Sequence, residues 1–217
     1  MAGRGISDDQ IGTRTLAGCV AQGRRGRVDQ AVRRALARWP DVPAVTGWLA
    51  LDRRGEWRLR NPANGAFERI GNAALREFIA RNYASDARGA WFFQNGPQRV
   101  YVRLESTPLV FRWFGNGFRD HCGHACGALD GAWIDEQGAL YLAGVRGAGV
   151  IDDRDLGAVS SMLEDRGGGP LDPAFDWAAA APGDARLRVG AAQCLEVGRV
   201  VRAALGDRLG FVSDPAL

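Results

Sequence analysis

The chain has 217 residues, which is enough for one domain with extensions or two small domains, and for a core that folds without disulfides or metal. Its 28 basic residues are all arginine and are spread along the chain beside 25 acidic residues, so a net charge of +3 does not indicate a nucleic-acid-binding surface. The sequence also lacks a membrane-spanning apolar run, the apolar core of a signal peptide and the cysteine spacing of a secreted disulfide framework. We therefore expect a soluble, cytoplasmic protein without a membrane partner.

Residues 1–41 are predicted to form an N-terminal arm followed by an amphipathic helix. The first 27 residues are rich in Gly and Arg and are expected to hold only a short helix, near residues 16–21. After them, apolar residues recur at helical spacing until Pro40 stops the helix. These apolar residues are Val28, Val32, Ala35, Leu36 and Trp39. We expect the helix to pack on a sheet; an acidic partner on its basic face is the alternative.

Residues 42–165 are predicted to form an α+β core domain. Its mainly antiparallel, meandering β-sheet is expected to have about six strands, with helices packed on it. A D-x-x-G motif followed by alternating apolar residues occurs at Asp52–Gly55, Asp86–Gly89 and Asp135–Gly138. In such a turn the Asp side chain accepts a backbone hydrogen bond and Gly tolerates positive φ. The motifs therefore predict tight turns that lead into strands.

The strongest strand signal is the stretch 91–113. Val100, Val102 and Leu104 are expected on one face, and Arg99, Tyr101 and Arg103 on the other, because side chains alternate along a strand. Pro108 cannot donate a ladder hydrogen bond, so we expect an edge position or a bulge there.

Two helices are predicted around this sheet, and a third after it. The first, over 72–83, begins at the N-cap Asn72 and buries Leu75, Phe78, Ile79 and Tyr83. The second follows Asp152, whose acidic neighbours are expected to cap it rather than bind a cation. Residues 166–217 are predicted to be a linker and a C-terminal helix or wrap, with the helix at 195–205 and a short closing strand at 210–212.

The near-regular spacing of Trp48, Trp91 and Trp133 raises the alternative of an internal repeat. Because the intervening segments differ, a single sheet that reuses one kind of turn is the simpler interpretation.

The strongest chemical signal is the loop His121–Cys126, which holds both histidines of the chain and two of its four cysteines. Thiolates and imidazoles are zinc ligands, so His121, Cys122, His124 and Cys126 form a candidate metal site. One short loop does not easily wrap a tetrahedral ion, and a polar hairpin loop without metal is the other interpretation. A redox role for the two cysteines is less favoured because the C-x-x-C motif is absent.

A candidate binding surface is formed by Arg99, Tyr101 and Arg103. An aromatic side chain between arginines on a strand is typical of surfaces that stack nucleic-acid bases, although nucleic acid is not the favoured partner here. The sequence contains no nucleophile elbow, P-loop or dinucleotide-binding glycine motif.

The central stretch resembles a family of bacterial proteins defined as a domain of unknown function. The resemblance is carried by Arg81–Tyr83, Asp86, Gly89, Trp91–Val102, Leu104–Glu105 and Thr107–Pro108. It covers about residues 42–165 and extends weakly to Gly210–Val212. It implies a bacterial cytosolic protein and no particular chemistry.

Taken together, these patterns predict a non-enzymatic binding or accessory module, whose partner is a protein or a small ligand. No cofactor is expected. Zinc binding through the loop His121–Cys126 is the first alternative, and a nucleic-acid-binding sheet surface is the second.

Overall fold

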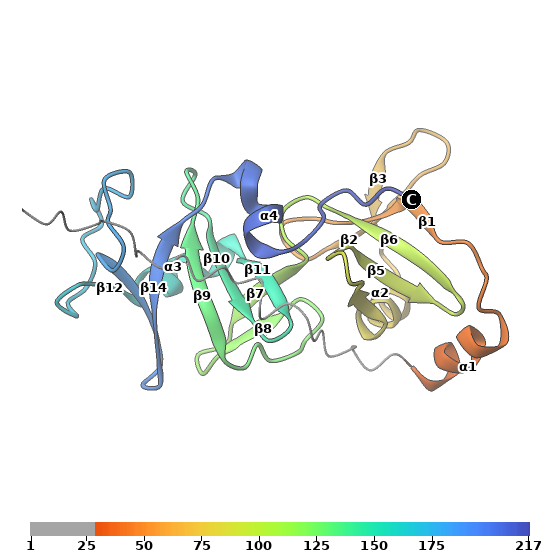
Figure 1. The fold of residues 1–217 in the computed structure, drawn as a ribbon, viewed down its shortest axis with the longest axis horizontal. Helices are drawn as coiled ribbons and strands as arrows, with labels where there is room; N and C mark the ends of the chain where they lie inside the picture. The colour runs from red at the N-terminus through yellow and green to blue at the C-terminus, as the bar shows by residue number, and fades with distance from the viewer. Residues whose placement is uncertain (1–28) are drawn as a thin grey trace, which may run out of the picture.

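The computed structural model describes residues 29–217, so the predicted arm and its short helix lie outside the described residues (Figure 1). Helix α1 (Gln30–Arg38) confirms the predicted amphipathic helix. Val32 is buried, but Trp39, which was expected to face the sheet, is exposed.

The first sheet is built from a meander, a helix and a second meander. Its elements are β1 (Val45–Leu51), β2 (Trp57–Arg60), β3 (Phe67–Arg69), α2 (Ala73–Arg81), β4 (Tyr83–Ser85), β5 (Trp91–Asn95) and β6 (Gln98–Leu104). The strand order is β3-β2-β1-β6-β5-β4, in which only the β1–β6 pair is parallel. Asn72 caps α2 by accepting a hydrogen bond from the Leu75 N–H at 3.0 Å, as predicted.

The second sheet contains the rest of the described strands. They are β7 (Leu109–Trp113), β8 (Phe118–Asp120), β9 (Leu129–Ile134), β10 (Leu140–Gly144), β11 (Gly147–Ile151), β12 (Leu163–Asp165), β13 (Ala185–Val189) and β14 (Gln193–Arg199). Between β11 and β12 lie a 3-10 turn, η3 (Asp153–Asp155), and α3 (Leu156–Ser160); after β14 come η4 (Arg202–Ala204) and α4 (Leu205–Leu209). The order is β12-β13-β14-β9-β10-β11-β7-β8.

The described chain is therefore mostly β, and most strand pairs are antiparallel as predicted, but the strands form two mixed sheets of six and eight strands where one sheet of about six was expected. Three parallel pairs join strands that are distant in sequence: β1 with β6, β7 with β11, and β9 with β14. The alternation of apolar residues shows which face of a strand is buried, but it does not show which strand lies beside it. The three parallel pairings could therefore not be predicted from the sequence.

The two sheets share a repeated unit, contrary to the simpler interpretation of the sequence. Strands β1–β6 around α2, and β9–β14 around α3, have the same topology, with the first and last strands paired in parallel at the centre. Leu49 is paired with Val102 in the first unit and Ala132 with Val197 in the second. The tryptophan spacing does not mark this repeat, because Trp48 corresponds to Gly131 and not to Trp133.

The predicted helix over 195–205 is also wrong, because residues 193–199 form β14 beside β9. The spacing of Leu195 and Val197 is compatible with a strand as well as a helix. Residues 193–199 adopt the strand because they pair with β9. Helix α4 follows at Leu205–Leu209 instead.

Each unit sends a segment to the other sheet. Pro108, expected at an edge position or a bulge, lies in the connection that carries the chain from β6 to β7. The C-terminal segment returns from α4 to the first sheet, where Val212 bridges Ala90 and the Leu104 N–H donates to the Ser213 carbonyl at 2.7 Å (Figure 1). The predicted closing strand is thus a single bridge. Among residues 29–217, no helix is long and apolar enough to cross a membrane.

Candidate functional site

The three predicted D-x-x-G motifs all form the same hydrogen-bonded turn. In each, one carboxylate oxygen of the Asp accepts the backbone N–H groups two and four residues later, at 2.8–3.0 Å. The Gly in the fourth position has φ near +80°. The second oxygen also has a partner: Arg58 on Asp52, Tyr101 on Asp86, and Tyr141 on Asp135.

The His121–Cys126 loop begins with a fourth copy of this turn, at Asp120–Gly123. Asp120 Oδ1 accepts the N–H groups of Cys122 and His124 at 3.0 and 2.9 Å, and Arg146 Nε donates to Oδ2 at 2.9 Å. Gly123 has a φ of +87°. The sequence carries this turn as a D-x-x-G motif, although Asp120 was not among the predicted site residues.

His121 is partly buried and packs against aromatic side chains of the core. Its ring packs beside those of Trp57 and Tyr83, at centroid distances of 5.2 and 5.8 Å. Its Nδ1 accepts the Val110 N–H at 3.3 Å, so Nε2 carries the ring proton, and that atom is 3.5 Å from Cys122 Sγ. Burial lowers the pKa of His121 to about 4 and raises the pKa of the Cys122 thiol. Both groups are therefore neutral near pH 7, and the imidazole turns no basic nitrogen toward the sulfur.

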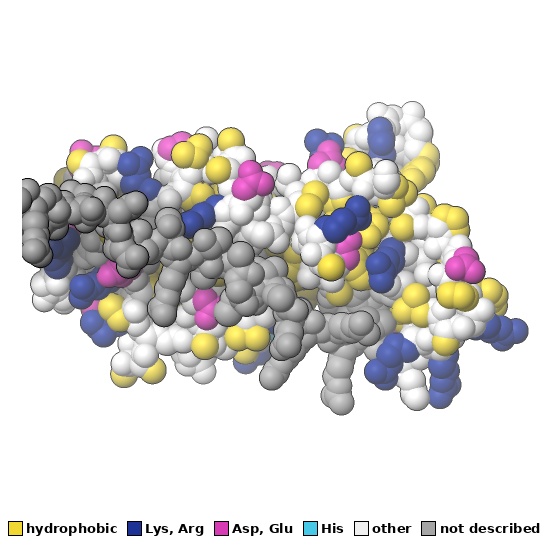
Figure 2. Space-filling model, in the orientation of Figure 1, with side chains coloured by type: hydrophobic (Ala, Val, Ile, Leu, Met, Phe, Trp, Pro, Cys, Tyr) yellow, Lys and Arg dark blue, Asp and Glu magenta, His cyan; other side chains and the backbone are white. Residues whose placement is uncertain are grey.

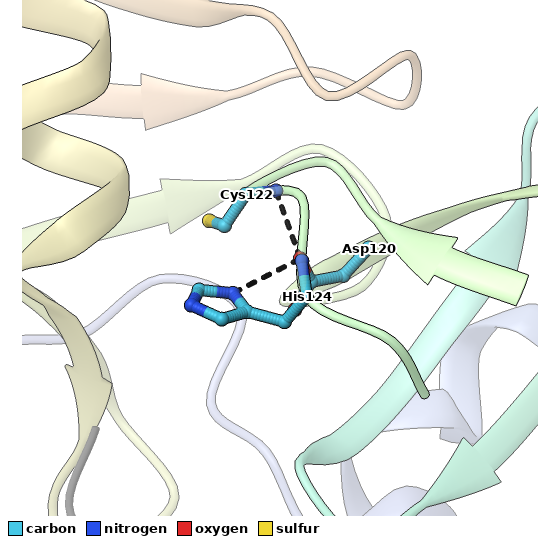
Figure 3. Close-up of side chains that lie close together, drawn as sticks. All are labelled: Asp120, Cys122 and His124. Atoms are coloured by element: carbon cyan, nitrogen blue, oxygen red, sulfur yellow. Dashed lines mark hydrogen bonds and ion pairs between the residues drawn. The ribbon is translucent and has the colours of Figure 1, made fainter. Parts of the chain in front are cut away.

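The loop brings together two of its four predicted metal ligands. Ligand atoms of Asp120, Cys122 and His124 all lie within 4.8 Å of one another (Figure 3). His121 and Cys126 are not members of this cluster. Cys126 is buried, and desolvation raises the pKa of its thiol to about 12. Asp120, which the sequence interpretation omitted, takes its place in the cluster through the turn.

The outward face of β6 carries Arg99, Tyr101 and Arg103. Tyr101 is only 5% exposed, and its hydroxyl donates to Asp86 at 3.0 Å. Arg99 lies over the Phe92 ring at 4.7 Å, and Arg103 pairs with Asp214 at 3.7 Å. The tyrosine ring is thus not available to stack on a base. In Figure 2, basic and acidic side chains are interspersed over the uncovered part of the molecule's face.

An apolar groove lies between the core-side face of the first sheet and α2. Its volume is about 340 Å³. The stretch 91–113 contributes Phe93, Val100 and the two polar residues of the lining, Asn95 and Gln98. The other lining residues are Val45, Trp48, Leu49, Leu59, Ile70, Leu75 and Ile79.

The rim of this groove exposes large apolar side chains. Trp48 is 46% exposed, Leu59 47% and Leu75 37%. Leu75 was predicted to be buried with the rest of the α2 stripe, and its exposure corrects that prediction, whereas Ile79 and Tyr83 are buried as expected.

The corresponding face of the second unit is closed. Leu49 and Ala132 hold equivalent positions in β1 and β9, since each is paired with a valine of the parallel strand beside it. Leu59 is paired with Leu49, and Leu142 is paired with Ala132. Leu59 and Leu142 are therefore equivalent. Leu142 is completely buried. Residues 171–178 lie between β12 and β13.

Two contacts fix that segment. Leu171, Phe175 and Trp177 pack against the core, and the Ala178 carbonyl accepts a hydrogen bond from Arg199 at 2.7 Å. Arg199 shares its face of β14 with Val197, which is paired with Ala132.

A protein-family model described as "Protein of unknown function (DUF2946)" matches residues 28–216. The chain belongs to this family. No curated protein matches this DUF2946 protein. A solved structure of a DUF1285 family protein from Silicibacter pomeroyi DSS-3 is 15% identical to it and covers 57% of this chain and 74% of that chain. Its TM-score of 0.42 is too low to carry an argument.

Sequence reasoning missed the rim of the groove in this DUF2946 protein. Trp48 and Leu59 carry the pattern of strand residues that face a core, and apolar alternation cannot tell a covered face from an open one. The missed Asp120 is different, because its D-x-x-G motif was visible in the sequence.

Proposed function

We propose that this DUF2946 protein is a non-enzymatic binding module and that the groove between the first sheet and α2 is its binding site. The observation that carries the proposal is the contrast between the two units. The strand position that is buried in the second unit, at Leu142, is half exposed in the first, at Leu59, and Trp48 is exposed beside it at the rim of the groove. Exposed apolar side chains that gather at a concave site are typical of binding surfaces.

The lining favours an uncharged, mainly apolar small molecule. Among residues 29–217, no charged side chain lines the groove. A charged ligand would lose its hydration there without gaining an ionic partner from these residues. A volume of about 340 Å³ falls at the lower end of small-ligand pockets. The Asn95 and Gln98 amides offer hydrogen bonds at one part of the lining, so a ligand with a single polar group suits the site.

Binding is favoured over nucleophilic catalysis by the state of the Cys–His pair. His121 and Cys122 are both partly buried and neutral, and the imidazole proton lies toward the sulfur. An activated cysteine requires the opposite arrangement, with a base that accepts the thiol proton. The cytoplasmic location and the domain boundaries expected from the sequence stay predictions.

A fluorescence titration with N-phenyl-1-naphthylamine, an uncharged apolar probe, tests the proposal. We expect saturable binding that is weakened about tenfold or more by Trp48→Ser and by Leu59→Ser, since each removes apolar contact worth on the order of 1–2 kcal/mol. The matched controls are Phe114→Ser and Val145→Ser, which remove exposed apolar side chains outside the groove lining. Equal binding by all four variants, or no saturable binding by the parent protein, would overturn the assignment.

A further inference from the structure

We propose that Asp120, Cys122 and His124 form a three-ligand site for a zinc-type divalent metal ion. A carboxylate, a thiol and an imidazole supply the three ligand classes that zinc accepts in proteins. Their donor atoms all lie within 4.8 Å of one another on a single turn (Figure 3). This set replaces the four residues expected from the sequence and is independent of the groove.

The separation of the donor atoms suits one ion. His124 Nδ1 lies 3.3 Å from an Asp120 oxygen. Two ligand atoms placed about 2.0 Å from a tetrahedral zinc ion lie about 3.3 Å apart, so this pair needs little rearrangement. On binding, the thiol proton and any proton on His124 Nδ1 are released to solvent, and the metal takes their place.

The neighbouring groups hold the carboxylate in place. Arg146 donates to Asp120 Oδ2 at 2.9 Å from the turn between β10 and β11, while two backbone N–H groups hold Oδ1. Hydrogen bonds of this kind orient metal-ligating carboxylates and are part of a working site. The side chain of His124 is 43% exposed, which leaves the cluster open to an incoming ion.

The turn itself does not require a thiol and an imidazole. The other three turns make the same hydrogen bonds, yet none places Cys or His at the third and fifth positions. The corresponding pairs are Arg54 with Glu56, Arg88 with Ala90, and Gln137 with Ala139. Turn formation thus accounts for Asp120 and Gly123. It does not itself require Cys122, which packs against the core beside His121, or His124, whose ring nitrogen lies within hydrogen-bond distance of Asp120.

His121 and Cys126 are excluded from the ligand set on geometry. For His121 Nε2 to bind a metal, the proton would have to move to Nδ1, where the Val110 N–H already occupies the acceptor position. Cys126 is buried outside the cluster, with its backbone N–H donating to Phe118 at 2.9 Å. These two residues therefore provide matched controls for the two proposed ligands of the same types.

Titration of the full, untagged, metal-free chain with Co²⁺ tests this site. The Cys19→Ser/Cys194→Ser background keeps only the two loop cysteines. We expect a thiolate-to-cobalt charge-transfer band that saturates at one ion per chain and that excess Zn²⁺ removes.

The band should be lost in Cys122→Ser, and Co²⁺ binding should weaken by more than about tenfold in His124→Ala. The charge-transfer band should persist in Cys126→Ser and His121→Asn. His124 is partly exposed, so its variant is expected to keep the native circular dichroism spectrum even if Cys122→Ser does not fold. Absence of the band, or its equal loss in Cys126→Ser and Cys122→Ser, overturns the proposal.

Discussion

Leu59 on β2 and Leu142 on β10 occupy equivalent positions in the two units, yet Leu59 is 47% exposed and Leu142 is completely buried. The same strand position therefore serves as part of an open groove in one unit and as part of the core in the other. In the second unit Phe175 and Trp177 pack against the core. The first unit leaves the corresponding face open beside α2.

This difference predicts unequal effects of the same substitution on stability. Leu142→Ala should lower the free energy of unfolding by about 3–5 kcal/mol, because it leaves a cavity in the core. Leu59→Ala should lower it by roughly 1 kcal/mol or less, because the side chain is already half in solvent. Urea unfolding of both variants measures the difference. Equal losses would show that the groove is closed in solution.

The Asp turns are expected to contribute strongly to stability. Asp135→Ala removes the acceptor for the Gln137 and Ala139 N–H groups and for the Tyr141 hydroxyl, at 2.9, 2.8 and 2.7 Å. We expect a loss of about 2–4 kcal/mol, since buried polar groups are left without partners. Asp172→Ala is the control, because Asp172 accepts one exposed N–H, from Ala174. A similar loss in both variants would contradict this role of the turn.

The contact between the Asp86 turn and the C-terminal segment predicts a third effect. Gly89 and Gly138 hold the same turn position, with φ of +79° and +80°. A Cβ at Gly89 would lie 2.4 Å from the Gly210 carbonyl oxygen, whereas one at Gly138 would meet no atom within 4 Å.

Gly138→Ala should therefore cost about 1–2 kcal/mol for positive φ alone, and Gly89→Ala roughly 1–3 kcal/mol more. Urea unfolding gives both values, and faster carboxypeptidase digestion of Gly89→Ala reports release of the segment. If the two variants are indistinguishable in both assays, the C-terminal segment does not pack on this turn.

Tyr141 predicts a pH effect. Burial, together with the bond from its hydroxyl to Asp135, raises the pKa of Tyr141 above 10.0. The unfolded chain ionises first, so the stabilisation from Tyr141 is full below pH 10 and is lost as the pH rises further. We expect Tyr141→Phe to leave tyrosinate absorbance of the folded protein unchanged near pH 10, and to reduce only the rise that accompanies alkaline unfolding. A smaller rise before unfolding would show that Tyr141 is accessible.

Local hydrogen bonding accounts for what the sequence predicted well. The three D-x-x-G turns and the Asn72 cap depend on residues within a few positions of one another, and they form as expected. The parallel pairing of β1 with β6 depends on strands separated by a meander and a helix, and no periodicity reports it.

The candidate sites were also predicted only in part from the sequence. Cys122 and His124 were identified because their chemistry is visible in the sequence, but only the turn geometry adds Asp120 and separates Cys126 from the cluster. The groove was not predicted, because apolar alternation along the strands does not show whether the Leu59 position is buried, as Leu142 is, or exposed.

The most direct test of the groove is a methyl NMR spectrum of the protein with and without N-phenyl-1-naphthylamine. The account predicts shift changes for the methyl groups of Leu59, Leu75 and Ile79, with those of Leu142 and Leu187 unchanged. Changes centred on Leu142 and Leu187, or none at Leu59, would contradict it.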